Sequence, residues 1–166
     1  MVEILNRKSI RKYKDIKVSE EIVEELLRAG MQAPSAGNEQ PWEFIVLRDK
    51  AIMKKITEVH PYSKMLLNTD VAIVVCGDKS KELFKGFWVQ DCSAAVENIL
   101  LAVEGKGLGA VWLGVYPLKD RVDALKDLLN LPKSVIPLSI IPIGYPDEQR
   151  EAVNRFDKTR IHYDRW

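Results

Sequence analysis

The chain has 166 residues, of which 46% are hydrophobic and 30% are charged, and its formal net charge is +1. This length suits one domain with a single core, and the near-neutral charge argues against a nucleic-acid partner or an anionic-membrane surface. No apolar run approaches the roughly 20 residues needed to span a bilayer, and the N-terminal residues are mixed and charged rather than signal-like. We therefore expect one domain over residues 1–166, in the cytoplasm, with no membrane partner.

The densest basic cluster lies near the N-terminus, at residues 7–14, RKSIRKYK. It fits a solvated basic turn. It also fits an anion site, because arginine forks and a serine hydroxyl suit phosphate oxygens. The residues alone leave both interpretations open.

A capped helix and an irregular loop follow the basic cluster. Ser19 is expected to cap a helix that stops near Ala33, because Pro34 disfavours helical geometry in the residue before it. Residues 34–42, PSAGNEQPW, predict a loop with free amide and hydroxyl groups and little bulk. That loop is either a plain connector or a surface for a flat ligand.

Two strands and a helix come next. Phe44–Leu47 indicates a buried strand, and Asp49 is expected to cap a helix that ends at His60. A lone histidine there is more often a surface or helix-terminal residue than a catalyst. Val71–Cys76 is an uninterrupted β-branched run typical of a central strand, and Lys79–Lys85 is a charged connector.

The stretch Phe87–Val115 organises the rest of the chain. Its first part is apolar around most of a helical circumference, so that helix needs its own sheet as a partner and has room for another subunit. One narrow polar stripe is expected on it: Gln90, Asp91, Glu97, Asn98 and Glu104. Gly105, Gly107 and Gly109 then lead into a strand. A dinucleotide fingerprint needs the strand before its glycines and the helix after them, so this order excludes one.

The last third of the chain predicts one helix, one strand and a tail. Leu118–Leu129 has helical spacing. Val135–Ile143 indicates a strand that is an edge or bulged element, because Pro137 and Pro142 interrupt it. The polar tail, residues 155–166, ends on aromatic side chains, so we expect it to dock on the body of the chain or on a partner subunit. By pattern alone, strands that alternate with helices favour a parallel, doubly wound sheet.

Side chains for direct catalysis are scarce. The chain has two histidines, and it lacks a Walker-type loop, a G-x-S-x-G elbow and a metal-binding run. Cys76 and Cys92 lie in apolar patterns, as buried free thiols of a reducing compartment do. If the protein is an enzyme, a cofactor carries the reactive chemistry and the chain positions it.

Four separated segments together resemble the nitroreductase family of FMN-dependent oxidoreductases, over essentially the whole chain. The most specific is APSAGNEQPW at residues 33–42; the others are RKSIR at 7–11, the long helix with VWLG at 111–114, and KTR at 158–160. The resemblance implies an α+β fold, with a mixed, mainly antiparallel sheet flanked by helices, in an intertwined homodimer. It overrules the parallel sheet that the pattern favours.

The resemblance also implies an FMN site with contributions from both ends of the chain. The groups implied for the phosphate and ribityl chain are Arg7, Lys8, Ser9, Lys158 and Arg160. Arg11 would serve the pyrimidine edge of the flavin. Lys64 would take the place of a family lysine near the N1/O2 edge, although residues 61–63 depart from the family motif.

Two further segments are implied to line the isoalloxazine ring. The backbone of Leu113 and Gly114 would face it, with an N–H near N5. The loop residues implied to reach the flavin from the other protomer are Pro34, Ser35, Ala36 and Asn38. The connector at residues 79–86 is shorter than the family's usual insertion, so the open flavin face is expected to be more exposed.

The implied activity is that of an FMN-dependent NAD(P)H oxidoreductase that reduces nitroaromatics, quinones or similar small electron acceptors by ping-pong hydride transfer. The reductant is NADH or NADPH. Three alternatives stay open: another flavin chemistry such as flavin reduction or dehalogenation, a flavin-binding or redox-sensing protein with little turnover, and a dimeric structural domain whose basic ends hold an anion.

Overall fold

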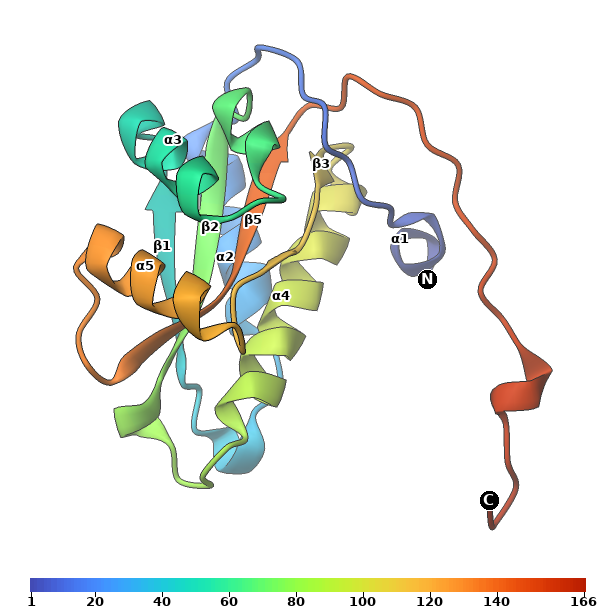
Figure 1. Ribbon diagram of the computed structural model, residues 1–166. Helices are drawn as coiled ribbons and strands as arrows, with labels where there is room; N and C mark the ends of the chain where they lie inside the picture. Colours follow the sequence, from blue (N-terminus) through green and yellow to red (C-terminus); the bar gives the residue numbers. More distant parts are fainter.

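The computed structural model describes residues 1–166, and a five-stranded sheet with helices on both faces forms its centre (Figure 1). The strands are β1 Trp42–Leu47, β2 Val71–Asp78, β3 Gly109–Ala110, β4 Leu113–Gly114 and β5 Val135–Gly144. Their order is β1-β2-β5-β3, with β4 also paired to β5. Every pairing between these strands is antiparallel, which agrees with the mainly antiparallel sheet that the resemblance implies. The parallel sheet that the pattern alone favours is wrong.

The antiparallel order follows from where the connections leave and re-enter the sheet. β1 ends at Leu47, which pairs with Ala72 near the start of β2. The 23 residues between β1 and β2 (48–70 by position) therefore leave and return at one end of the sheet. A parallel neighbour would need a crossover to the opposite end.

Five α-helices surround the sheet: α1 Val2–Asn6, α2 Glu20–Met31, α3 Lys50–Val59, α4 Trp88–Gly105 and α5 Lys119–Leu129. The two predicted N-caps are confirmed. Ser19 accepts a hydrogen bond from the Ile22 N–H, and Asp49 accepts from Ala51 and Ile52. Four short 3-10 turns join these elements: η1 Ala36–Asn38, η2 Lys64–Leu67, η3 Lys79–Lys81 and η4 Lys158–Arg160.

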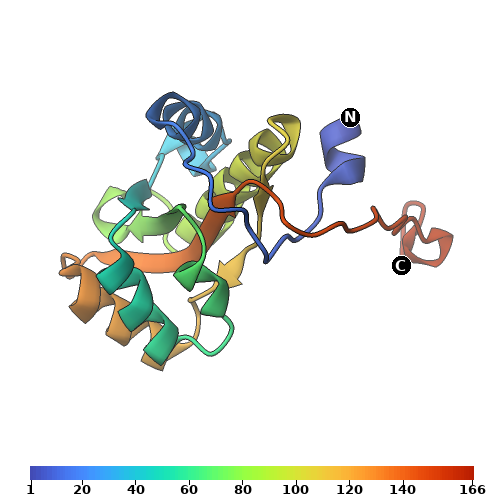
Figure 2. The ribbon, with the colours of Figure 1, turned by 90° about the horizontal axis from the view of Figure 1, so that it is seen from above.

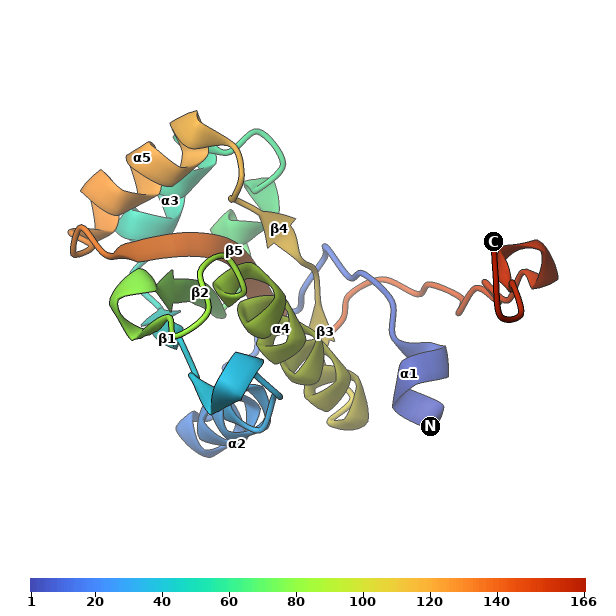
Figure 3. The same cartoon turned by 90° about the horizontal axis from the view of Figure 1, so that it is seen from below.

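The sheet separates two apolar cores. α2 and α4 cover one face, and α3 and α5 cover the other (Figure 3). In β2, Val71, Ile73 and Val75 face α4, whereas Ala72, Val74 and Cys76 face α3 and α5. Burial on both faces explains why the β2 sequence is apolar without alternation.

β5 is an interior strand, which corrects the prediction of an edge and confirms that of a bulge. The register shifts where Val75 pairs with Ser139 and Cys76 pairs with Pro137, which leaves Leu138 as the extra residue. On its other side, the break between β3 and β4 lies opposite Pro142. A proline is tolerated there because the neighbouring ladder is interrupted.

The two ends of the chain project from the body. α1 and the tail after Tyr145 extend to one side of the sheet (Figures 1 and 2). Residues 151–166 are exposed throughout, so the tail does not dock on the body of its own chain. No helix combines the length and the apolar character needed to cross a bilayer.

Candidate functional site

The basic segment at residues 7–11 lies against β3, although the two are about 100 positions apart in the sequence. Ser9 forms a parallel bridge with Ala110, and the Ile10 N–H donates to the Ala110 carbonyl at 2.8 Å. A Cβ atom on Gly109 would lie 2.7 Å from Cβ of Ile10. The glycine therefore allows this close approach.

Two glutamates in the polar stripe of α4 form ion pairs with the basic segment at residues 7–11. Arg7 Nε lies 3.2 Å from Glu97 Oε1, and Lys8 Nζ lies 3.0 Å from Glu104 Oε1. These two pairs orient the side chains along the helix. They also neutralise part of the positive charge, so Lys8 is a weaker anion site than its sequence context indicates.

Two predicted donors in this segment remain free. The Ser9 hydroxyl and the Arg11 guanidinium have no hydrogen-bond or ion-pair partner in the chain, and the Arg11 side chain is exposed. The backbone at this point is fixed by the segment that follows β5: Glu148 Oε1 accepts from the N–H groups of Arg11 at 2.5 Å and Lys12 at 3.2 Å. Free donors on a fixed backbone suit an anionic ligand.

A hollow of about 620 Å³ opens beside the basic segment. It is lined by Lys8, Ile10, Glu104, Gly107, Leu108, Pro146, Glu148, Gln149, Arg150 and Glu151. Three carboxylates and two cations give this wall a mixed charge. A phosphate group placed here would need further cations.

A second hollow, of about 280 Å³, lies next to β4. Its lining residues are Arg11, His60, Tyr62, Val111, Trp112, Leu113, Gly114 and Arg121. It brings together three of the residues implied by the resemblance, Arg11, Leu113 and Gly114. A Cβ atom on Gly114 would meet nothing within 4 Å, so the backbone there is open to a flat ligand.

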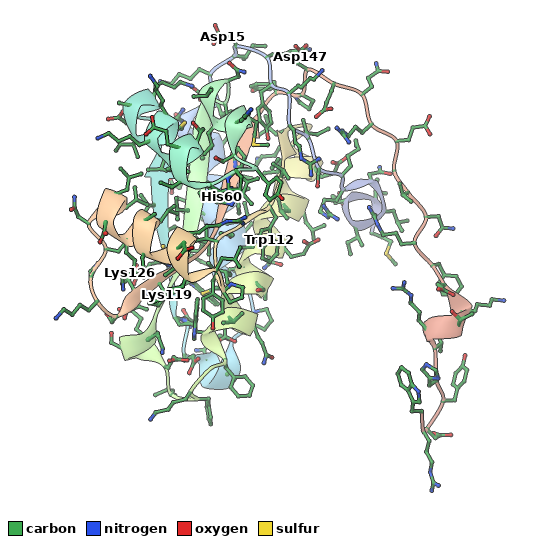
Figure 4. The ribbon with its side chains drawn as sticks, viewed as in Figure 1. Asp15, His60, Trp112, Lys119, Lys126 and Asp147 are labelled. Carbon is green, nitrogen blue, oxygen red and sulfur yellow. The ribbon has the colours of Figure 1, made fainter.

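Three side chains that line this hollow are not among the predicted site residues: His60, Tyr62 and Arg121. His60 ends α3 as expected, but it is buried, with 1% exposure, and its Nε2 lies 2.9 Å from the Gly114 carbonyl oxygen. His60 and Trp112 lie near one another in the middle of the molecule (Figure 4). Local spacing in the sequence does not reveal these three side chains as a group, because Arg121 lies about 60 positions after His60 and Tyr62.

The loop at residues 34–38 is attached to the opposite end of α4. The Ala36 N–H donates to Asp91 Oδ1 at 3.0 Å. Glu39 Oε2 accepts from the N–H groups of Leu83 at 2.6 Å and Phe84 at 3.0 Å, which ties the connector to the loop. Pro34 and Asn38 are exposed.

This attachment separates the loop from the basic segment. Asp91 and Glu104 are 13 positions apart on one helix, which corresponds to about 20 Å at 1.5 Å per residue. One chain therefore does not bring Ala36 and Lys8 into the same site.

Asp91 is buried, with 5% exposure, although it was expected beside the polar stripe. Burial raises the pKa of Asp91, and the neighbouring Glu39 raises it further, against the hydrogen bond from Ala36. Burial would also raise the pKa of Glu39. The hydrogen bonds from the N–H groups of Phe84 and Leu83 outweigh this effect, so the pKa of Glu39 is lowered. Oε1 of Glu39 and Oδ2 of Asp91 have no other partner, so a proton held by Asp91 satisfies both.

The remaining predicted residues lie outside both hollows. Lys64 is exposed at the start of η2 and does not line the hollow next to β4. Lys158 and Arg160 form η4 on the tail, where Arg160 Nε pairs with Asp157 Oδ2 at 3.3 Å. No group of three or more His, Cys, Asp or Glu side chains is arranged to hold a metal ion.

Comparison with known proteins places this geometry in a family context. The model of the nitroreductase family matches residues 4–61 and 59–145. A protein of Methanothermobacter thermautotrophicus, provisionally named NADH dehydrogenase/NAD(P)H nitroreductase, is 53% identical over 163 residues, which cover 98% of this chain and 85% of that protein.

Solved structures agree with the sequence match. A crystal structure from Parabacteroides distasonis with the same provisional name has a TM-score of 0.96 and 46% identity, and it covers 99% of this chain and 97% of its own. A provisionally named nitroreductase from Desulfovibrio desulfuricans, crystallised in complex with FMN, has a TM-score of 0.86 and 30% identity, with 99% and 96% of the two chains covered.

Proposed function

The chain belongs to the nitroreductase family, and from that premise we propose that it is an FMN-dependent NAD(P)H oxidoreductase that reduces nitroaromatics, quinones or similar small electron acceptors. The observation that carries the proposal is that the free guanidinium of Arg11 and the open backbone of Gly114 line one hollow. Phosphate and pyrimidine groups need such donors, and a flat ring needs such a backbone. The FMN bound to the Desulfovibrio desulfuricans neighbour supports the same cofactor here.

When bound, FMN supplies the redox chemistry, because it accepts a hydride equivalent from NADH or NADPH and passes electrons to a second substrate. The chain supplies binding and orientation. Ser9 and the free N–H groups of Arg7 would hold the phosphate and ribityl chain, with Lys8 beside them. Arg11 would donate to the pyrimidine edge, and Leu113 and Gly114 would present their backbone to the ring.

We further propose a homodimer in which residues 1–166 of each chain form one FMN-binding domain. The loop at Pro34–Asn38 is attached to α4 at Asp91, about 20 Å along the helix from Glu104, the partner of Lys8, so we expect a partner chain to complete a site with both. The projecting ends carry exposed apolar side chains that a partner would bury: Val2, Ile4, Leu5, Val153, Phe156 and Trp166. A groove of about 650 Å³ runs between α1 and residues 152–156.

The tail carries further cations for the hollow of about 620 Å³ beside the basic segment, whose wall holds three carboxylates and two cations. Lys158 and Arg160 lie on an exposed segment with no contact to the body, so they can join a phosphate site when the tail packs in the dimer. Two free, buried thiols, Cys76 and Cys92, fit a reducing compartment that supplies NAD(P)H, the cytoplasm.

Steady-state kinetics test the proposed activity. We propose that the nicotinamide and the acceptor use the same open face of the flavin in turn, so the nicotinamide leaves before the acceptor binds. Initial rates measured against NADH or NADPH at several fixed concentrations of a nitroaromatic or quinone should give parallel double-reciprocal lines. Intersecting lines, which require both substrates bound together, would contradict the ping-pong order.

A further inference from the structure

The carbonyl oxygen of Gly114 receives two hydrogen bonds from side chains of different helices. His60 Nε2, at the end of α3, and Arg121 Nη1, in the first turns of α5, each lie 2.9 Å from it. Two donors satisfy both lone pairs of a carbonyl oxygen. The Gly114 peptide is therefore fixed in one orientation at the wall of the hollow.

The protonation of His60 follows from its partners. Its Nδ1 accepts the Tyr62 N–H at 3.3 Å, so the proton of the neutral ring is on Nε2, where it can be donated to Gly114. Burial lowers the pKa of His60, and the charge of Arg121 lowers it further, although the bond to Gly114 acts in the opposite direction. His60 is thus a neutral donor that positions its neighbours.

Arg121 brings a charge to the hollow that no carboxylate neutralises. Its guanidinium Cζ lies 5.6 Å from the centroid of the Tyr62 ring, and its hydrogen bond is to the Gly114 carbonyl. Arg11, on the same wall, is also without an ion-pair partner. Two uncompensated arginines favour a ligand with negative charge or electron-rich oxygen atoms.

We propose that Arg121, held by the Gly114 carbonyl and the Tyr62 ring, supplies the positive charge at the pyrimidine edge of the flavin, in the role that the family resemblance gives to Lys64. The inference rests on the proposed function, because it concerns the same FMN site. Two-electron reduction adds negative charge to that edge, so a fixed cation there stabilises reduced FMN more than oxidised FMN. Lys64 is exposed and does not line the hollow, so its effect is screened by water.

Redox titration of FMN-loaded variants tests the proposal, with the ratio of the dissociation constants of reduced and oxidised FMN as the readout. Arg121→Gln keeps an N–H donor but removes the charge, and it should raise this ratio about tenfold, which shifts the midpoint potential to a more negative value. Arg121→Lys keeps the charge and should stay near the wild-type ratio. Lys64→Gln, the matched control, should leave the ratio unchanged.

Two results would overturn the proposal. A shift in Lys64→Gln without one in Arg121→Gln would return the role to Lys64. An equal loss of affinity for both forms of FMN in Arg121→Gln would make Arg121 structural only. If wild-type protein does not bind FMN at all, the proposed function itself has failed, which is evident before any variant is compared.

The positioning role of His60 gives a separate test that does not depend on the folding of Arg121 variants. His60→Leu removes the donor to Gly114 and should raise the same ratio by a smaller factor, whereas His60→Gln, which retains an N–H donor, should restore it. Equal ratios in His60→Leu and wild type would contradict the positioning role.

Discussion

The carboxyl groups of Asp91 and Glu39 are buried next to each other, between the first turn of α4 and the loop at residues 34–40. Asp91 also accepts the Ala36 N–H, and Glu39 also accepts from the connector. The pair therefore joins three segments, one of which is proposed to reach the partner's flavin. We expect Asp91 to retain a proton that would join the two carboxyl groups, because its pKa is raised by burial and by Glu39.

We expect the free energy of unfolding to fall as this proton is lost. The pKa of Asp91 is raised in the folded state, so its contribution is full below the ordinary aspartate pKa of about 3.9 and disappears as pH rises through the raised value. Glu39, whose pKa is lowered, contributes above its ordinary value and loses that contribution as pH falls through the lowered one. Urea unfolding between about pH 4 and about pH 8 should show this decline in wild type.

Two substitutions of Asp91 separate the proton from the hydrogen bond. Asp91→Asn cannot ionise and should flatten the pH dependence. Asp91→Ala leaves the partly buried Ala36 N–H and Oε1 of Glu39 without a partner and should cost about 1–3 kcal/mol. An unchanged slope in Asp91→Asn would show that the pair does not hold the proton.

Glu148 should control the order of the basic segment. Its carboxylate accepts the backbone N–H groups of Arg11 and Lys12, and its pKa is lowered because these bonds and Arg150 outweigh the effect of burial. Glu148→Ala should increase hydrogen exchange at Arg11 and Lys12 and weaken FMN binding by about tenfold or more, since hydrogen bonds to charged groups contribute about 1.5–3 kcal/mol. Glu148→Gln keeps an acceptor and serves as the control. Unaltered exchange in Glu148→Ala would refute this role.

Substitution of Gly109 and Gly114 by alanine should have different effects: the first should lower stability, and the second should weaken FMN binding. Gly109→Ala places a Cβ atom 2.7 Å from Ile10 and should cost about 1–3 kcal/mol of stability, as overpacked sites do. Gly114→Ala meets nothing within 4 Å, so it should change stability by less than about 0.5 kcal/mol but weaken FMN binding. Thermal unfolding without ligand and FMN titration measure the two effects. Equal losses of stability would contradict the assignment.

The elements with a clear period or cap could be predicted from the sequence. α4 and the two-faced strand β2 show their burial in their apolar spacing, and Ser19 and Asp49 show the starts of their helices. The position of β5 could not be predicted, because the prolines that favour an edge are accommodated by a bulge and by the break between β3 and β4. Such accommodation depends on the neighbouring strands.

The candidate site also has one part that could be predicted from the sequence and one part that could not. The basic segment and the loop are contiguous in sequence, so their residue types could be recognised directly. The group around Gly114 could not, because His60 and Arg121 meet at a carbonyl oxygen only when α3 and α5 pack side by side. Asp91 was assigned to the polar stripe because helical periodicity does not reveal a backbone N–H that needs an acceptor.

Mixed dimers should reveal that one site uses two chains. Arg7→Glu with Arg11→Glu damages the basic segment, and Ala36→Arg obstructs the loop. Either variant alone should bind little FMN. When the two are mixed and allowed to exchange subunits, one site per mixed dimer combines an intact segment with an intact loop, so FMN binding should recover to at most one per mixed dimer. Recovery should not occur when two copies of the same variant are mixed, and its absence in the mixed sample would place both elements in the same chain's site.

We propose above all that this chain is a flavoprotein reduced by a nicotinamide. Purified protein should be titrated with FMN, freed of unbound FMN, and mixed with NADH or NADPH without oxygen while the visible absorbance of the flavin is followed. We predict one FMN per chain, rapid bleaching by one or both nicotinamides, and recovery of the absorbance when a nitroaromatic or quinone is added. A protein that stays colourless after reconstitution, or whose bound FMN neither nicotinamide reduces, would contradict the account.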